Sequence, residues 1–194
     1  MGRTTVAGVD MDRERCGWGN SAPEYVAYHD EEWGTPLRGD DALFERLCLE
    51  AFQSGLSWIT ILHKRPAFRA AFADFAIDAV AAFTVEDEAR LMADAGIVRN
   101  RAKITAAVRN ARAAQDLPDG LSDLLWSFAP AGPRPRPATL ADVPATTPES
   151  IAMAKELKRR GFVFVGPTTA YALMQATGMV DDHVADCFRA SAGG

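Results

Sequence analysis

Residues 41–52 read DALFERLCLEAF, and this stretch decides the fold class. Its apolar residues recur every three or four positions, so they form one face of an α-helix that covers about half of the circumference. Gly39 precedes the stretch and Gly55 follows it, which bounds the helix on both sides. The chain contains no pair of alternating segments joined by an Asn-Gly or Asp-Gly turn, which is the signal of a β-hairpin. We therefore predict an all-α fold.

Capping residues, prolines and glycines predict further helices on both sides of this stretch. Ser21, Pro23 and Glu24 combine an N-cap, a first-turn proline and a capping-box acid, so a helix should begin there and run toward Trp33. The apolar segment 58–62 has an ambiguous period. The same rules predict four more helices, over residues 84–95, 101–115, 147–161 and 167–178.

The proline-rich segment 129–147 interrupts the helical pattern. Because proline cannot continue a helix, we expect this segment to connect two lobes. The chain has 194 residues, of which 48% are hydrophobic and 24% charged, and these values fit one globular domain. We expect that domain to span residues 15–188, with a disordered extension at 1–14 and a flexible tail at 189–194.

Composition also excludes several classes of protein. No stretch approaches the roughly 18 apolar residues that cross a bilayer, and the N-terminus lacks a signal peptide. We therefore expect a cytoplasmic protein without a membrane partner. Three cysteines are too few for a disulfide framework, so their expected roles are metal binding, catalysis or core packing. The net charge of -5 argues against a nucleic-acid partner unless local charge differs.

The local charge does differ, because two basic clusters interrupt the acidic background. Residues 99–112 contain five Lys or Arg residues and no acid, and residues 155–160 contain four with only Glu156 between them. Such clusters either follow a phosphate backbone or form solvated helix faces, and charge alone leaves both readings open. Lys158 and Arg160 are our candidates for contact with phosphate.

The segment GFVFVGPTTA, residues 161–170, lies between two predicted helices and resembles the helix-hairpin-helix motif of DNA-binding proteins. In that motif a glycine lets main-chain N–H groups approach a phosphate, and the following helix N-terminus adds its positive dipole end. Gly166 and Thr168 would face the phosphate. The motif is atypical because Phe164 replaces the usual first glycine, and a plain helical hairpin is the alternative.

Two Cys–His pairs lie near the two ends of the chain. Cys16 and His29 form one pair, and His183 and Cys187, four residues apart, form the other. Together they offer two thiolates and two imidazoles, which is a tetrahedral zinc set. Their spacing is not that of a zinc finger, so unrelated core and surface residues are the alternative.

Aromatic residues and one carboxylate gather near these pairs. Trp18, Tyr25, Tyr28 and Trp33 fall within sixteen positions, and stacked aromatic rings suit a flat cationic base, although a core cluster is the alternative. Glu50 lies at the edge of the apolar face of residues 41–52, where an unpaired charge is costly. It is either a member of a structural ion pair or a site carboxylate.

These motifs together resemble the 3-methyladenine DNA glycosylase I family, over residues 15 to about 188. The resemblance rests on CGW at 16–18, YHDEEWG at 28–34, CLE at 48–50, QSGLSWIT at 53–60, LWSF at 125–128, KRRGFVFVG at 158–166 and DHV at 182–184.

The family resemblance implies an all-α fold of two lobes with a base pocket between them. It implies one structural zinc ion that links the N- and C-terminal segments through Cys16, His29, His183 and Cys187. It also implies base contacts by Trp18, Tyr25, Tyr28 and Trp58, with Glu50 as the catalytic residue at the hydrogen-bonding edge of the purine. Gly55 and Leu56 match the loop that enters the duplex.

The implied activity is base-excision repair, in which a monomer flips 3-methyladenine out of alkylated double-stranded DNA and releases the free base by hydrolysis. The enzyme would act in the cytoplasm at the nucleoid. We expect no lyase step, and the catalytic Asp of the wider superfamily is missing, because the next acid after Gly166 is the distant Asp181. The alternatives are a zinc-stabilised, non-catalytic DNA-damage binding module and a zinc hydrolase of small molecules, which needs an open coordination position.

Overall fold

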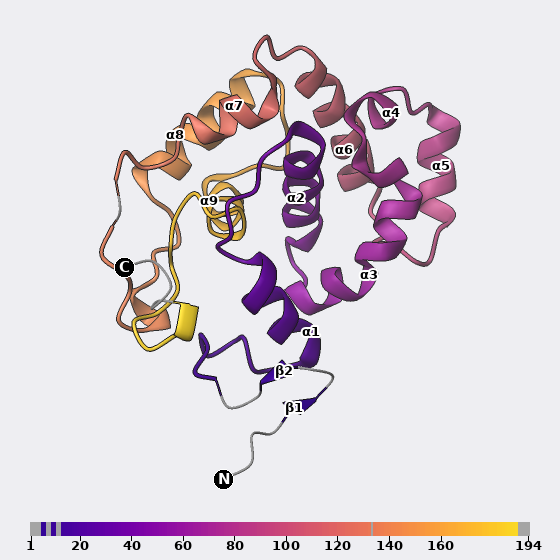
Figure 1. Ribbon diagram of the computed structural model, residues 1–194. Helices are drawn as coiled ribbons and strands as arrows, with labels where there is room; N and C mark the ends of the chain where they lie inside the picture. The colour runs from indigo at the N-terminus through magenta and orange to yellow at the C-terminus, as the bar shows by residue number, and fades with distance from the viewer. Residues whose placement is uncertain (1–4, 7–8, 11–12, 133, 190–194) are drawn as a thin grey trace.

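The computed structural model describes residues 5–6, 9–10, 13–132 and 134–189, and its domain is built from helices (Figure 1). The two strands β1 (Thr5–Val6) and β2 (Val9–Asp10) form one short antiparallel pair before the first helix. The predicted all-α class of the domain is confirmed. The helices are α1 (Pro23–Ala27), η1 (Tyr28–Glu32), α2 (Asp40–Gln53), α3 (Trp58–Ala71), η2 (Ala73–Phe75), α4 (Ile77–Ala81), α5 (Val85–Ala93), α6 (Arg101–Gln115), α7 (Gly120–Trp126), η3 (Leu140–Asp142), α8 (Pro148–Arg159) and α9 (Pro167–Ala176).

Helix α2 is the central element of the fold. It contacts α3, α4 and α6 on one side and α7 and α9 on the other, so the helices form two lobes around it (Figure 1). Leu43, Phe44, Leu47 and Leu49 have no exposed surface. A helix with neighbours on both sides buries more than one apolar face, and α2 also buries the polar residues Arg46 and Glu50. The pattern of residues 41–52 therefore predicted only the apolar half of the buried surface.

The capping signals predicted two helix starts correctly. Thr84 caps α5 and Thr147 caps α8, because each side-chain oxygen accepts the main-chain N–H three residues later. Helix α6 begins and ends where its pattern predicts. These boundaries follow from satisfying N–H groups that the first helical turn leaves without partners.

The predicted capping box at Ser21 is wrong, although a helix does begin nearby. Ser21 Oγ donates a hydrogen bond to the Trp18 carbonyl at 2.6 Å, and the N-cap Ala22 makes no side-chain bond. After α1 the chain continues as the π-helix η1, in which the Trp33 N–H donates to the Tyr28 carbonyl at 2.8 Å. The wider turn of a π-helix changes which side chains share a face.

The segment predicted to connect the lobes contains one short helix in its described part, η3. No helix among residues 5–6, 9–10, 13–132 and 134–189 is long and apolar enough to cross a membrane. Residues 1–4, 7–8, 11–12 and 190–194 lie outside the described residues. The expected disorder of the extension and the tail therefore stays a prediction.

Candidate active site and metal centre

A cavity of about 510 Å³ is lined by residues of both lobes and of η3. This volume falls in the range of small-molecule sites. All five residues that the sequence assigned to base contact or catalysis line it, namely Trp18, Tyr25, Tyr28, Glu50 and Trp58. The structure thus brings together residues from α1, η1, α2, α3 and the segment before α1.

Aromatic rings form one wall of the cavity. The ring of Trp18 lies edge-on to Tyr25 at 5.6 Å and to Trp33 at 5.2 Å, and Tyr28 lies 5.4 Å from Trp58. The Tyr25 hydroxyl accepts the main-chain N–H of Ile59 at 3.0 Å, which ties α1 to the start of α3. Such a wall offers both stacking and cation–π attraction to a flat ligand.

Glu50 is one of two acids that line the cavity, the other being Asp182, and it is only 6% exposed. Loss of hydration raises the pKa of its carboxyl to about 7, and the nearby Arg46 guanidinium opposes this shift. Arg46 is itself held by Glu32 at 2.9 Å and lies over the Tyr28 ring at 5.4 Å. Within the described part of the chain, the Glu50 carboxylate accepts no hydrogen bond. Its oxygens are therefore free to accept hydrogen bonds from a ligand or to balance a cation.

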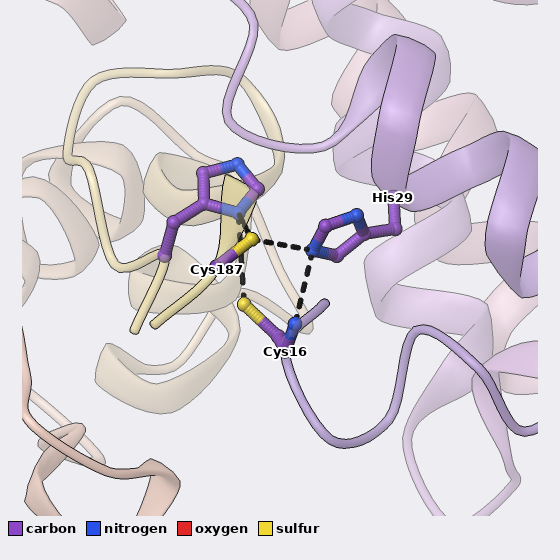
Figure 2. Close-up of side chains that lie close together, drawn as sticks. Cys16, His29 and Cys187 are labelled. Atoms are coloured by element: carbon purple, nitrogen blue, oxygen red, sulfur yellow. Dashed lines mark hydrogen bonds between the residues drawn. The ribbon is translucent and has the colours of Figure 1, made fainter. Parts of the chain in front are cut away.

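Four ligand atoms converge beside this cavity. Cys16 Sγ lies 3.6 Å from His183 Nδ1, and Cys187 Sγ lies 3.4 Å from His29 Nε2 and 3.5 Å from His183 Nδ1. Figure 2 shows Cys16, His29 and Cys187 pointing toward one another from segments at the two ends of the chain. A tetrahedral metal ion with ordinary bond lengths separates sulfur and nitrogen ligands by about 3.6 Å. The four residues are therefore arranged to hold a metal ion.

The surroundings of the four ligands also fit a metal ion. Asp30 accepts a hydrogen bond from His29 Nδ1 at 2.9 Å, so Nε2 is the nitrogen with the lone pair that a metal needs. In this structure Nε2 accepts the Cys16 main-chain N–H at 3.4 Å. Burial raises the pKa of the Cys16 thiol to about 12, so a bare thiolate is unfavourable there and a cation would stabilise it. Gly34 has φ +74°, and a Cβ at this position would lie 2.8 Å from His183 Nε2, so only glycine leaves room for this ring.

The π-helix η1 places consecutive residues in the two sites. Tyr28 lines the cavity, whereas His29 belongs to the metal cluster. Trp33 joins the sites from the other end of η1, because it lines the cavity and lies edge-on to His183 at 4.7 Å. The metal cluster therefore supports one wall of the cavity.

Several cavity residues were missed by the sequence analysis. Trp33, Gln53, Gln175 and Asp182 line the cavity, although none was assigned a role. Asp182 precedes a metal ligand, and Trp33 belongs to the aromatic segment, so their positions in the sequence carried a signal. Gln175 carried none, because a glutamine on a helix is ordinary.

The loop at Gly55 and Leu56 is exposed. Gly55 has φ +83° and nothing within 4 Å of its Cβ position, and Leu56 is 41% exposed. The Lys103 ammonium holds the end of α2 by donating hydrogen bonds to the carbonyls of Phe52 at 3.1 Å and Ser54 at 2.5 Å. The exposed loop at Gly55 and Leu56 therefore begins at the end of α2 that Lys103 holds in place.

The hairpin between α8 and α9 is held by α6, which is also the helix that carries Lys103. The Asn110 side chain accepts the Val163 N–H at 2.8 Å and donates to the Val163 carbonyl at 3.0 Å. Asn110 lies seven residues after Lys103, which is two turns and about 10 Å along the helix axis. Helix α6 thus carries the Leu56 loop and the hairpin on one face.

The two basic clusters differ in structure. Lys103, Arg109 and Arg112 donate to main-chain carbonyls, so these members of the first cluster hold loops and helix ends in place. In the second, Lys158 is exposed, whereas Arg160 pairs with Glu156 at 2.8 Å.

At the hairpin, Gly166 and Thr168 are exposed at the start of α9. Phe164, in the place of the usual first glycine, has φ +60° and is 48% exposed. A non-glycine residue in this left-handed conformation is uncommon.

The chain is similar to known proteins over nearly its whole length. The family model described as methyladenine glycosylase matches residues 18–190. DNA-3-methyladenine glycosylase 1 of Escherichia coli (strain K12) is 49% identical over 178 residues, which are 90% of this chain and 95% of that protein. A crystal structure of 3-methyladenine DNA glycosylase I superposes with a TM-score of 0.86 at 46% identity, covering 90% of this chain and 98% of the other. A variant of such an enzyme in complex with 3-methyladenine superposes with a TM-score of 0.85 at 36% identity, covering 90% of this chain and 96% of the other.

Proposed function

The chain belongs to the methyladenine glycosylase family, and from this premise we propose that it releases 3-methyladenine from alkylated DNA. The observation that carries the proposal is the aromatic cavity with the buried, unbonded carboxylate of Glu50. Its substrate would be double-stranded DNA with alkylated bases, and its product the free base. We further propose that it acts as a monomer, at the nucleoid in the cytoplasm.

The charge of the substrate explains how this cavity selects it. Alkylation at N3 makes adenine cationic, and a cation beside Glu50 favours the ionised carboxylate. The aromatic wall of Trp18, Tyr28 and Trp58 adds stacking and cation–π attraction. A neutral base gains less and does not offset the cost of keeping the carboxylate ionised without water.

The positive charge of the alkylated base also reduces the acid catalysis that the protein must supply. When water bonds to C1′ of the sugar, it loses one proton to the solvent, and the base leaves with the electron pair of the N-glycosidic bond and becomes neutral. The leaving group therefore needs no proton from the enzyme. The tasks of the chain are to extrude the nucleotide, which costs less for a damaged base, and to hold it. We expect no lyase step.

We propose zinc as the ion held by Cys16, His29, His183 and Cys187. Two thiolates and two imidazoles are zinc ligands, and four protein ligands complete the tetrahedral set of a structural site. The ion would supply a link between the chain ends and no reactive position. This assignment disfavours a zinc hydrolase, and X-ray absorption that counts the protein ligands tests it.

We place DNA on the face of α6 that carries the Leu56 loop and the hairpin. Leu56 would fill the space that the flipped base leaves, and Gly166 and Thr168 would meet a phosphate at the start of α9. Lys158 would add a salt-dependent contact, as would Arg160 if Glu156 released it. Replacing Lys158 with Ala should then lower the slope of log K against log salt by about 1.

Base release from methylated duplex DNA tests the proposed function. The protein is incubated with DNA treated with dimethyl sulfate, and the released bases are separated by chromatography. We expect 3-methyladenine from the wild type and much less from Glu50→Gln. The matched control is Glu45→Gln, because Glu45 lies on the same helix but pairs with Arg69 at 2.8 Å. DNA binding without release would instead establish a non-catalytic damage-binding module.

A further inference from the structure

Gln175 presents an amide to the cavity in one fixed orientation. It lies on α9 and lines the cavity, and its Nε2 donates a hydrogen bond to Asp182 Oδ2 at 2.8 Å. Only the NH₂ group of an amide can donate, and Asp182 Oδ2 accepts this bond, so the amide turns its NH₂ group toward Asp182. The carbonyl oxygen Oε1 is then the atom left for a ligand, and in the described structure it accepts no hydrogen bond.

Asp182 is itself held in place by Tyr171 and Arg134. It is 6% exposed, and the Tyr171 hydroxyl donates to the same Oδ2 at 2.5 Å. Arg134 donates to the Tyr171 hydroxyl at 3.0 Å and lies 3.8 Å from Asp182 Oδ1. Gln53 provides the contrast, because it also lines the cavity but its amide has no partner among the described residues. Gln53 can turn either end to a ligand, whereas Gln175 cannot.

The cavity lining therefore includes two groups that can only accept a hydrogen bond from a base, the ionised Glu50 carboxylate and Gln175 Oε1. Methylated adenine has a single group that donates to them, the 6-amino group, because its remaining ring nitrogens are acceptors or carry carbon. That group has two N–H bonds, one for each acceptor. Guanine has a 6-oxo group at this place, and an oxygen there would face Gln175 Oε1 without a proton between them.

We propose that Gln175 determines specificity for alkylated adenine over alkylated guanine, by accepting a hydrogen bond from the 6-amino group. Asp182 is a positioning residue that acts through the Gln175 amide. The inference rests on the proposed function and adds to it the residue that tells the two purines apart. A site that hydrogen-bonds a substrate rejects an analogue lacking the partner, because its own polar group then stays unpaired.

Gln175→Met tests the proposal, because methionine keeps the length of the side chain and removes the amide. Release of 3-methyladenine and 3-methylguanine is measured from the same methylated duplex in single turnovers. We expect the ratio of the two rates to fall about tenfold, mostly through slower release of 3-methyladenine. The affinity for free 3-methyladenine should fall by a similar factor. An unchanged ratio would overturn the proposal.

The matched control is Gln115→Met. Gln115 Nε2 donates to Asp78 Oδ1 at 2.8 Å, the same pairing as in Gln175 and Asp182, but it is on the surface and away from the cavity. Both release rates should stay at their wild-type values. A wild-type protein that releases neither base contradicts the proposed function itself. Release of 3-methyladenine with an unchanged ratio in Gln175→Met contradicts only the role of Gln175.

Two variants of Asp182 separate positioning from charge. Asp182→Asn keeps an oxygen that accepts from Tyr171 and Gln175, so the ratio should stay near that of the wild type. Asp182→Leu removes the acceptor, and the ratio should fall as it does in Gln175→Met. Metal content is measured in both, because His183 is the next residue. Equal loss of selectivity in both variants at full metal content would show that the carboxylate charge acts by itself, which overturns the positioning role.

Discussion

Cys16 Sγ lies 3.6 Å from His183 Nδ1, although the two residues are 167 positions apart in the chain. Cys187 and His29 approach each other across 158 positions in the same cluster. A metal ion held by these residues would close a loop that contains both lobes. Closing so long a loop removes conformational freedom from the unfolded chain, and the metal–ligand bonds add to the stability of the folded state.

We therefore expect Cys187→Ser to lose bound metal and thermal stability together. A loss of about 4 kcal/mol would lower the Tm of a chain of this size by roughly 8–16 °C. Elemental analysis gives the metal content, and scanning calorimetry gives the Tm. Cys48→Ala is the control, because Cys48 is a buried free thiol outside the cluster and its removal should leave the metal bound. A Cys187→Ser protein with full metal content and an unchanged Tm would contradict the metal assignment.

Glu50→Gln should change how stability depends on pH. The pKa of Glu50 is raised to about 7 in the folded protein from an ordinary value near 4.5, so between these values the folded state binds more protons than the unfolded state. Wild-type stability therefore falls as pH rises through this window, by on the order of 3 kcal/mol in total. Glutamine has no proton to lose, so the free energy of unfolding of Glu50→Gln relative to the wild type should increase by about 1 kcal/mol from pH 6 to pH 8.

Urea denaturation of the metal-bound proteins at several pH values checks this prediction. Glu45→Gln is measured in parallel, and its difference from the wild type should not follow the Glu50 window. A pH-independent difference between Glu50→Gln and the wild type would mean that the Glu50 carboxyl titrates near its ordinary pKa.

Sequence patterns predicted the elements whose signals are local. The apolar face of residues 41–52, the cap at Thr84 and the proline after Thr147 each specify a helix through contacts within a few residues. The sequence did not predict helix α3, because its apolar start at 58–62 has an ambiguous period and the helix also contains Pro66. Its helical state depends on packing against α1 and α2, which no local signal reveals.

The candidate site was predictable where a motif carried it and unpredictable where contacts between distant segments did. Cys16 and His183 were paired through their chemistry and the family resemblance. The bond from Gln175 to Asp182, by contrast, depends on how the chain after α9 folds back onto that helix. The sequence assigned Lys103 to the basic cluster at 99–112, and only the structure shows that Lys103 holds the end of α2.

We expect Lys103→Met to destabilise the protein and loosen the Leu56 loop. The buried ammonium donates two hydrogen bonds to main-chain carbonyls, and losing them should cost about 2 kcal/mol. Excision from duplex DNA should fall, while affinity for free 3-methyladenine should hold, because Lys103 does not line the cavity. Lys155→Met, at an exposed position on α8, is the control. Equal losses in excision and in free-base affinity would show that the variant damages the cavity and not the loop.

Leu56→Ala should slow excision from duplex DNA with little effect on stability. Leu56 is 41% exposed in the free protein, so its truncation should change the free energy of unfolding by less than about 0.5 kcal/mol. In the duplex, an apolar side chain in the gap offsets an unstacking cost of a few kcal/mol, so its loss should slow release roughly tenfold to a hundredfold. Single-stranded DNA has no base-paired gap for the Leu56 side chain to fill. Release from it should therefore slow far less. The control is Val85→Ala, an exposed apolar residue on α5 that should leave both rates unchanged. If Leu56→Ala slows release from duplex and single strand equally, the Leu56 side chain acts on base binding or folding. The residue that fills the gap in the duplex must then be sought elsewhere on the face of α6.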